Sequence, residues 1–510
     1  MARLAYLLAC LFHILLPTHG LPTHQAPLLA EDTQNFAKAD ILLPIDHFNS
    51  ADTRVYSNKY WIYADSYQRG GPVFLYDGGE RGVSDHGTHL SFSPLHPLLA
   101  LAKRLGGLAL VWEHRFYGES LPFPDLTADA SPDENEGAYR YLNTEQALED
   151  AVFLATHFQP PGLEHFWDDL KPERAPWVWI GGSYPGQRAA MIRKRNPDVF
   201  RAAWSSSAPV ETAVDFPEYY LHISRDLPSG CRRVIQRVVR YVDEVLLEGS
   251  AVQKSQLRWE IARRWPSDRS LLSKIAFTLW GLDFHVASHL TSVIAWDWQT
   301  AGMTGPMNRT CTALRKVDTL NQPRGTDTAA LSAVLDAIES STEDFAGKPR
   351  FSPADQQAWQ YQVCTEYPFF RTSLPSSDYN VLSSILTPES IWANTCARQY
   401  PWLSYPPDIS ASRKYANWDS NLTNIMWTAG LQDPWQERSM LPKYSLVPDA
   451  PSNRTPTREV PGADQVPKDG RVFGLLFAEG RHCGDLSAGG DDAEEATDLF
   501  ERALGVWFRD

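Results

Sequence analysis

The sequence has little basic charge, few cysteines and, after its first twenty residues, no long apolar run. Its 62 acidic residues outnumber its 47 basic ones, which gives a formal net charge of −15. This balance disfavours nucleic acid or an anionic membrane as the main partner, because both repel a negatively charged protein. No later apolar stretch is long enough to cross a bilayer, and we find no internal repeat. With 510 residues and 43% hydrophobic content, the chain can bury a large core and exceeds the usual size of one domain.

The N-terminus has the features of an export signal. Arg3 precedes an apolar stretch over residues 4–16, and small residues follow it. This pattern is typical of a secretory signal peptide, which we place at residues 1–20, and a buried N-terminal helix is the alternative. Three sequons agree with export, and their asparagines are Asn308, Asn421 and Asn453. We therefore expect a protein that is secreted, or that is vacuolar or lysosomal.

Cysteine is scarce, and its number is informative. One of the 6 cysteines, Cys10, lies in the expected signal peptide. The five that remain are an odd number in an oxidising compartment, so one of them should be unpaired. They are Cys231, Cys311, Cys364, Cys396 and Cys483.

Apolar strands alternate with helical patterns in two parts of the chain. The expected strands lie within residues 71–79, 108–118, 177–182, 202–210, 424–435 and 471–486. An amphipathic helix over 142–158, opened by Asn143 or Thr144, lies among the earlier strands, and a helix over 494–508 closes the chain. This alternation predicts a parallel sheet with helices on both of its faces.

The region between these two parts has a different pattern. Residues 231–247 and 328–341 have helical periodicity, and the region contains no convincing strand. We therefore predict an α/β protein with the α/β-hydrolase fold and an inserted helical cap. Its parts after the signal peptide are the first part of the core at 21–215, the cap at 216–406 and the second part of the core at 407–510.

One short stretch indicates a nucleophile. The sequence WVWIGGSYPGQRAAM, residues 177–191, is an apolar run, a glycine-rich turn with Ser183 and a helix-forming segment. An α/β-hydrolase presents its nucleophile in this way, on a sharp turn from a strand into a helix. The usual motif is G-x-S-x-G, whereas Pro185 stands here at the second glycine and Gly186 follows it. An ordinary loop is the alternative, and it is tested by whether partners for the serine exist.

The histidine partner should follow the serine in the chain. His222, His285 and His289 lie in the helical region, where a structural role is the more common one. His482 lies just after an expected strand near the C-terminus. Since such sheets place their chemistry after the carboxyl ends of strands, we take His482 as the base, with a surface-loop histidine as the alternative.

The acid should come from the loop after the strand that begins near residue 424. Asp433 lies there, although an aspartate before a proline is also common in turns. Asp419 precedes the strand and Asp485 is too near His482 in the chain, so both are weaker candidates. The chemistry needs all three groups, because an imidazole must take the serine proton and a buried carboxylate must orient the imidazole.

The oxyanion of the tetrahedral intermediate needs hydrogen-bond donors. The backbone N–H of Tyr184 is one candidate, because it follows the nucleophile directly. The second should come from the sequence DGGE at residues 77–80, and we assign it to Gly79, next to Gly78. A simple tight turn is the alternative explanation for these glycines.

Taken together, the chain resembles the prolyl carboxypeptidase and dipeptidyl peptidase II family of serine peptidases, nearer to its secreted fungal members. The resemblance covers most of the mature chain, and seven motifs occur in the family's order. They are YDGGE, EHRFYGES, LNTEQALED, GGSYPG, YQVCTEYPFF, GLQDPW and GRHCGDL.

The resemblance implies the roles of the triad residues and a pocket. Ser183 would be the nucleophile, Asp433 the acid and His482 the base of a peptidase that cleaves after proline through an acyl-enzyme. A substrate pocket would lie between core and cap. The residues assigned to this pocket are Trp435, Trp359 and Glu113, and the rings of Tyr184 and Phe369 are further candidates. Core packing is an equal alternative for Trp359 and Phe369.

The resemblance implies a peptide as substrate, and we assign no cofactor and no metal ion. The chain departs from the animal members of the family at Pro185 and at Cys483, which leaves the specificity open. Whether the enzyme trims a C-terminal residue, an N-terminal dipeptide or an internal bond also stays open, as does the oligomeric state.

The cysteines of the cap region suggest a pairing. We expect the bridges Cys231–Cys311 and Cys364–Cys396, both in the cap or at its edge, because pairing within one inserted unit staples that unit. Cys483 would then be the free thiol.

Two other function classes are compatible with the motifs. A carboxylesterase or lipase uses the same fold and triad, although a lipase is expected to have a more continuous apolar lid. A non-catalytic binding protein on a hydrolase scaffold would typically lack one member of the triad, and here all three candidates are present.

Overall fold

The computed structural model describes residues 36–83, 93, 95–124, 132–264, 270–303, 305–318, 327–343, 352–444, 450–451 and 454–509. The expected signal peptide lies outside the described residues. The chain divides into two compact units. The helical unit comprises Asp215–Arg350 and Phe370–Thr395, together with Met1–Leu29. The hydrolase unit comprises Ala30–Val214, Phe351–Phe369 and Cys396–Asp510.

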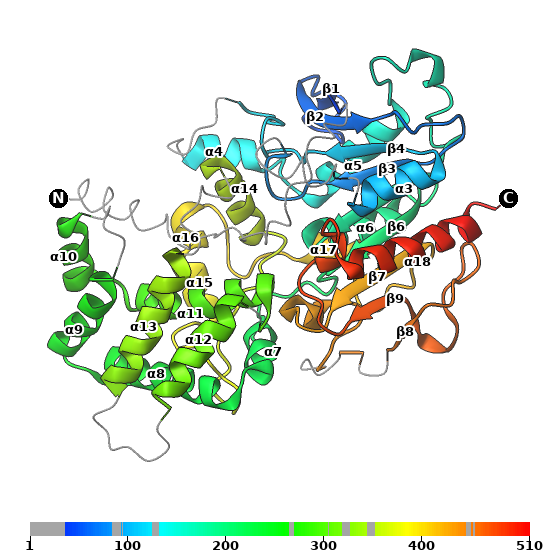
Figure 1. Cartoon of the computed structure of the whole chain (residues 1–510). Coiled ribbons are helices and arrows are strands. Elements are labelled where there is room, and N and C mark those ends of the chain that lie inside the picture. The colour runs from blue at the N-terminus through cyan, green and yellow to red at the C-terminus, as the bar shows by residue number, and fades with distance from the viewer. Residues whose placement is uncertain are drawn as a thin grey trace. The chain divides into compact units, whose positions relative to one another are not determined.

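The hydrolase unit is built on one mixed sheet, whose strands are labelled in Figure 1. The strand order is β1-β2-β4-β3-β5-β6-β7-β9-β8. The strands are β1 (Ala37–Pro44), β2 (Val55–Tyr63), β3 (Val73–Asp77), β4 (Leu108–Trp112), β5 (Trp177–Gly182), β6 (Phe200–Ser206), β7 (Ile425–Gly430), β8 (Pro456–Thr457) and β9 (Val472–Phe477). From β4 to β8 all neighbours are parallel, whereas β1 and β2 join the edge antiparallel. The six parallel strands from β4 to β9 were predicted; β1, β2 and the short edge strand β8 were not.

Helices cover both faces of this sheet. On one face, α3 (Pro97–Leu105) and α18 (Asp491–Trp507) bury apolar side chains such as Leu99 and Phe500 against the strands. On the other face lie α5 (Thr144–Thr156) and α6 (Tyr184–Arg195), and α6 packs directly on β5 and β6. The side chain of Asn143 caps α5 by accepting a hydrogen bond from the Gln146 N–H. The remaining helices of this unit are α4 (Pro132–Tyr139), α14 (Pro353–Val363), α16 (Cys396–Gln399), α17 (Ser410–Tyr415) and the short 3₁₀ helices η2 (Glu164–Phe166), η3 (Pro434–Arg438), η4 (Lys468–Gly470) and η5 (Gly484–Leu486).

The fold is that of an α/β-hydrolase. The central parallel strands are buried along their length because apolar and aromatic residues fill them, as in the run WVWIGG of β5. The carboxyl ends of β3, β5, β7 and β9 carry the loops in which the sequence placed the glycines of the oxyanion loop, the serine, the acid and the histidine.

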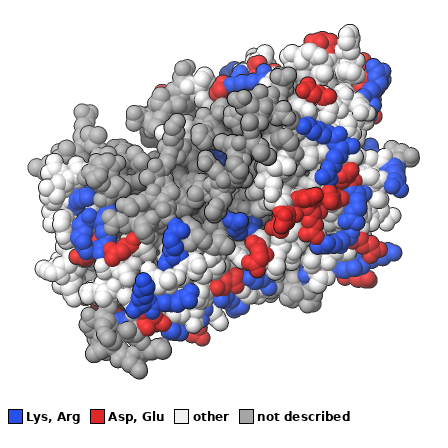
Figure 2. Space-filling view, in the orientation of Figure 1, with Lys and Arg blue, Asp and Glu red and all other residues white. Residues whose placement is uncertain are grey.

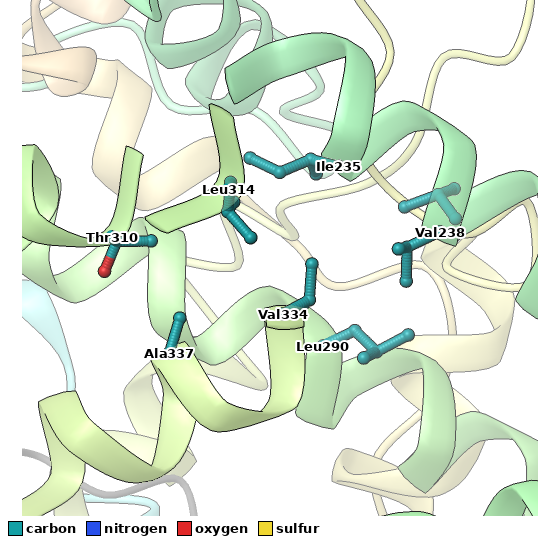
Figure 3. Close-up of a pocket in the computed structure, with 8 residues that line it drawn as sticks. Ile235, Val238, Leu290, Thr310, Leu314, Val334 and Ala337 are labelled. Atoms are coloured by element: carbon teal, nitrogen blue, oxygen red, sulfur yellow. The ribbon is translucent and has the colours of Figure 1, made fainter. Parts of the chain in front are cut away.

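The helical unit has its own apolar core. Its helices are α7 (Glu218–Asp226), α8 (Ser229–Glu248), α9 (Ala251–Ala262), α10 (Leu271–Trp280), α11 (Asp283–Ala301), α12 (Gly305–Lys316), α13 (Asp327–Glu343) and α15 (Pro388–Asn394). Figure 3 shows Ile235, Val238, Leu290, Leu314 and Val334 pointing from α8, α11, α12 and α13 into one small cavity. Because this lining is almost wholly apolar, the cavity is part of the packing between the four helices. Cys231 on α8 and Cys311 on α12 form a disulfide within the same unit.

One segment of the predicted cap lies elsewhere. The sequence assigned residues 216–406 to the cap, whereas Phe351–Phe369 and the chain from Cys396 onward belong to the hydrolase unit. The sequence between the two strand regions was interpreted as one continuous insertion, so this return to the hydrolase unit was not predicted. Long-range hydrogen bonds from α14 to the loops after β3 and β4 account for it.

The surface charge is mixed. Figure 2 shows acidic and basic side chains interspersed on the face that it presents. Ion pairs at the surface include those of Arg104 with Asp498 and Glu501. None of the described helices is both long enough and apolar enough to span a membrane.

Candidate active site

Ser183 lies at a sharp turn between β5 and α6. Its backbone has φ 65° and ψ −127°, a conformation that non-glycine residues rarely adopt, and its N–H donates to the Ser206 carbonyl at 2.9 Å. Glycine is required at both sides of the turn. A Cβ at Gly181 would lie 2.3 Å from the Pro185 oxygen, and one at Gly186 would lie 2.6 Å from the Ser206 oxygen. The local geometry is therefore that of a nucleophile elbow.

Pro185 fits this elbow without loss. It stands in the first turn of α6, where a backbone N–H has no partner within the helix, so its missing N–H costs nothing. Its ring lies against Gly79, where a Cβ would come within 2.7 Å of Pro185 Cγ. The departure from G-x-S-x-G is thus accommodated by a glycine on the neighbouring loop.

Asp433 and His482 meet through a direct hydrogen bond. His482 Nδ1 lies 2.9 Å from Asp433 Oδ2, and the Asp433 side chain is fully buried. Asp433 Oδ1 also accepts the Trp435 N–H at 3.0 Å, which fixes the plane of the carboxylate. Burial alone lowers the pKa of His482, but the charge of the Asp433 carboxylate outweighs it and holds that pKa well above its ordinary value. The carboxylate thus stabilises the imidazolium, the form that His482 takes once it has accepted a proton.

The histidine loop is anchored beside the serine. The Cys483 N–H donates to Ser207 Oγ at 2.9 Å. The buried Asp485 accepts from Ser206 Oγ at 2.6 Å and from Thr428 Oγ1 at 2.5 Å. A Cβ at Gly182 would lie 2.8 Å from Cys483 Sγ, so the neighbour of His482 contacts the neighbour of Ser183. Asp485, the weaker candidate for the acid, instead ties this loop to β6 and β7.

The side chain of Tyr184 is held by residues that the sequence did not single out. His114 Nδ1 lies 2.6 Å from the Arg115 oxygen and can only donate there, and burial keeps the pKa of His114 well below its ordinary value. The neutral ring therefore accepts at Nε2 from the Tyr184 hydroxyl, 2.9 Å away. That hydroxyl accepts in turn from Gln362 Nε2 at 2.8 Å. His114 lies in the motif EHRFYGES and Gln362 in the motif YQVCTEYPFF, but neither motif indicates a contact with Tyr184, so only the fold shows their role.

The expected role of Gly79 does not agree with the hydrogen bonds. The Gly79 N–H donates to Asp77 Oδ1 at 3.1 Å, and the Gly78 N–H donates to the Trp112 oxygen at 2.8 Å. Neither is directed at the nucleophile. Asp77 is itself held by Arg188 at 2.8 Å, in a pair with almost no exposed surface. Gly79 is needed for its left-handed φ of 73° and its contact with Pro185.

Glu80 follows in the same loop. Burial raises the pKa of its carboxyl, and the charge of His482 lowers that pKa in part, so the two groups interact electrostatically. The sequence analysis did not assign Glu80 a role, because a carboxylate next to a glycine pair carries no specific signal.

Glu113 has a structural role in place of the expected pocket role. Its side chain has no exposed surface, and its carboxyl accepts from the Val83 N–H, the Glu119 N–H and Ser120 Oγ. Burial raises its pKa to about 7, against the lowering effect of these bonds. A carboxyl with all its partners inside the protein cannot line a substrate pocket.

Aromatic rings lie on two sides of the site. Trp435 packs edge-on against Phe369, with ring centroids 5.4 Å apart, and lies 6.2 Å from the His482 ring. Trp359 lies 5.4 Å from Tyr184. Trp435 and Trp359 are both partly exposed, whereas Phe369 is buried. Trp435 therefore lies beside His482, and Trp359 lies beside Tyr184, the residue that follows Ser183.

The cysteines pair as the sequence analysis expected. The disulfides are Cys231–Cys311 and Cys364–Cys396, and Cys483 is free. Burial raises the pKa of the Cys483 thiol, so it stays protonated and is a poor nucleophile. Of the sequons, Asn308 is exposed on α12 and Asn421 is exposed in a loop, and Asn453 lies outside the described residues.

Several known proteins are similar to this chain. A protein of Arthroderma benhamiae named "Probable extracellular serine carboxypeptidase" is 25% identical, over 79% of this chain and 59% of that protein. The serine protease vicPa of Bipolaris victoriae is 26% identical over 89% of this chain and 88% of its own length. The lysosomal Pro-X carboxypeptidase of Mus musculus is 25% identical over 77% of each chain. A solved structure, the proline iminopeptidase of Mycobacterium smegmatis, aligns with 92% of this chain and 98% of its own, at 12% identity and a TM-score of 0.33.

The family profile described as serine carboxypeptidase S28 matches residues 43–446. This match covers most of the chain and includes Ser183 and Asp433, while His482 lies beyond its end. The chain belongs to the serine carboxypeptidase S28 family and is a serine-type peptidase with the α/β-hydrolase fold.

Proposed function

We propose that this peptidase cleaves bonds after proline, with Ser183 as nucleophile, His482 as base and Asp433 as the acid that orients the base. The hydrogen bond between His482 Nδ1 and Asp433 Oδ2 supports the triad most strongly. It leaves Nε2 of the ring to take the serine proton. The contact of Cys483 with Gly182 brings this ring to the side of the elbow.

The reaction would follow the acyl-enzyme route. Ser183 Oγ attacks the carbonyl carbon of the proline residue while His482 takes its proton, and the protonated ring then gives that proton to the leaving amine. In the second step, water attacks the acyl carbon while His482 takes a proton from it, and the ring then returns that proton to Ser183 Oγ. This step releases the peptide that ends in proline. Throughout, the Asp433 carboxylate stabilises the imidazolium, in line with the raised pKa of His482.

The oxyanion donors differ from those first expected. The Tyr184 N–H remains the first donor, because it opens α6 and has no acceptor one turn earlier. With the Gly78 and Gly79 N–H groups engaged elsewhere, the second donor falls to Glu80. Its backbone N–H is engaged with its own carboxyl, so the donor would be the carboxyl when protonated, a state that burial favours by raising the pKa.

Proline selectivity is supported by the rings beside the base. Trp435 and Phe369 form an edge-to-face pair next to His482, and such a wall suits a compact apolar ring that has no N–H to donate. The name of the mouse relative, a lysosomal Pro-X carboxypeptidase, agrees with this specificity. The names of two relatives, one extracellular and one lysosomal, and the two disulfides support our proposal that the mature protein is exported.

The test compares peptides that differ only in the residue before the scissile bond. We expect proline peptides to be cleaved far faster than alanine, leucine or lysine peptides. Equal rates for all four would remove the proline specificity and would still leave a serine peptidase.

A further inference from the structure

Two buried carboxylates join the loop after β3 to the loop after β4. Asp355 Oδ2 accepts the Gly82 N–H at 3.1 Å, and its Oδ1 accepts the Gly118 N–H at 3.0 Å. Glu113 Oε1 accepts the Val83 N–H at 2.8 Å, and its Oε2 accepts the Glu119 N–H at 3.0 Å. Each carboxylate thus bridges one N–H of the first loop and one of the second. Consecutive residues, 82–83 and 118–119, supply the four donors.

The two loops also touch backbone to backbone. A Cβ at Gly82 would lie 2.8 Å from Gly118 Cα, and a Cβ at Gly118 would lie 2.1 Å from Glu113 Oε1. Gly118 has a φ of 57°, which favours glycine. Neither Gly82 nor Gly118 can therefore be replaced by a larger residue without moving the loops apart. The two carboxylates hold the loops together in place of side-chain packing.

The first loop carries groups of the candidate active site. Gly79 lies against Pro185 of the elbow, and the Glu80 carboxyl interacts with His482. Any displacement of residues 82 and 83 would move this loop relative to Ser183. A shift of this kind costs rate, because catalytic geometry tolerates errors of only about 0.5 Å.

Asp355 reaches these loops from a distant part of the chain. It lies in the first turn of α14, where Ser352 Oγ accepts its N–H at 3.0 Å, and its side chain is 1% exposed. The same segment supplies Gln362, which holds the Tyr184 hydroxyl. Segment 351–369 thus contacts both the loop after β3 and the residue that follows the nucleophile.

We propose that Asp355 is a positioning residue of the peptidase, which acts with Glu113 to fix the loop at residues 78–83 beside the elbow. This inference rests on the proposed function of Ser183 and His482. Asp355 needs no contact with substrate for this role. Its two oxygens must both accept, because both donors are backbone N–H groups with no freedom to turn away.

The test is the variant Asp355→Asn, which keeps the shape but offers one acceptor oxygen and turns an NH₂ group toward the other N–H. We expect kcat, per active site titrated with a fluorophosphonate, to fall about 10- to 100-fold while KM changes less than about 3-fold. Hydrogen exchange of peptides that contain residues 78–83 and 114–119 should become faster. A kcat within about 2-fold of the wild type, with unchanged exchange, would overturn the proposal.

The matched control is Asp46→Asn. Asp46 Oδ1 also accepts a backbone N–H, from Phe48 at 3.0 Å, and an amide, from Gln146 at 2.6 Å, and it is in the same unit. This variant should keep kcat and the exchange of residues 78–83. An equal loss of kcat in both variants would indicate a general loss of stability and contradict a positioning role.

If Asp355→Asn does not fold, a second variant tests the positioning role. Gly82→Ala leaves the carboxylates intact and pushes the two loops apart, since the new Cβ meets Gly118 Cα. It should reproduce the loss of kcat at nearly constant KM, and an unchanged kcat would count against the proposal. Failure of the proposed function would look different: Ser183→Ala would retain activity, whereas the exchange of residues 78–83 would still respond to Asp355→Asn.

Discussion

His482 Nδ1 lies 2.9 Å from Asp433 Oδ2, although 49 residues separate the two in the chain. The two loops meet because β7 and β9 are adjacent parallel strands, and their carboxyl ends bring Asp433 and His482 to one edge of the sheet. Glycine makes the approach possible: a Cβ at Gly430 would lie 2.2 Å from the Gly480 oxygen. The hydrogen-bonded pair is thus a consequence of sheet topology and of two glycines.

The triad assignment predicts large and separable losses of activity. Ser183→Ala, His482→Ala and Asp433→Asn should each lower kcat/KM by about three orders of magnitude or more in a folded protein. A fluorophosphonate should label Ser183 in the wild type, which peptide mapping by mass spectrometry would show. Labelling at another serine, or near-normal turnover by His482→Ala, would contradict the assignment.

The ring pair of Trp435 and Phe369 predicts that a substitution of Trp435 lowers the preference for proline. Trp435→Ala should reduce the preference for proline over alanine by about 1–3 kcal/mol, because the ring that faces the substrate is removed while the triad stays. The ratio of kcat/KM for matched proline and alanine peptides measures this. Trp280→Ala is the control, since Trp280 is 73% exposed on α10. A preference that survives Trp435→Ala unchanged would place the proline site elsewhere.

The free cysteine predicts a silent substitution. Cys483→Ala should keep activity within about 3-fold of the wild type, because the neutral thiol packs against Gly182 and takes no part in proton transfer. Alkylation of the denatured, unreduced protein should add one label, at Cys483. Loss of activity comparable to that of His482→Ala would make this thiol part of the chemistry.

Glu113, which is buried, and Glu366, which is partly buried, predict a fold that is more stable at mildly acidic pH. Burial raises the pKa of Glu113 to about 7, and burial likewise raises the pKa of Glu366 to about 7, from an ordinary 4.5. Between pH 4.5 and 7 the folded state therefore holds protons that the unfolded state has lost. The free energy of unfolding falls as the pH rises through this window, and each carboxyl, whose pKa differs by about 2.5 between the two states, contributes about 3 kcal/mol.

Thermal unfolding between pH 4.5 and 8 tests this linkage. Glu366→Gln should flatten the dependence, because a glutamine keeps an acceptor for the Thr144 N–H and hydroxyl and does not titrate. The exposed Glu248→Gln should leave the dependence unchanged. A wild-type midpoint that rises from pH 5 to pH 7 would be opposite in sign to the prediction.

The sequence by itself determined the parts of this protein that depend on local pattern and chain order. The alternation of apolar strands and helices predicted the parallel sheet, because burial on both faces requires continuous apolar runs such as that of β5. The order Ser183, Asp433, His482 along such strands predicted where the candidate triad would lie. The pairing of Cys231 with Cys311 followed from their positions in one inserted region, whereas Cys364 and Cys396, which also pair as expected, both belong to the hydrolase unit.

Only the tertiary structure decided where individual groups point and which segments return to the core. The direction of the Gly79 N–H depends on Asp77, and the burial of Glu113 depends on two loops that close over it, so neither could be read from the motifs. Segment 351–369 lies within the sequence region that we assigned to the cap. It belongs to the hydrolase unit because Asp355, Gln362 and Glu366 form hydrogen bonds with residues of that unit. Such long-range hydrogen bonds cannot be predicted from the local sequence.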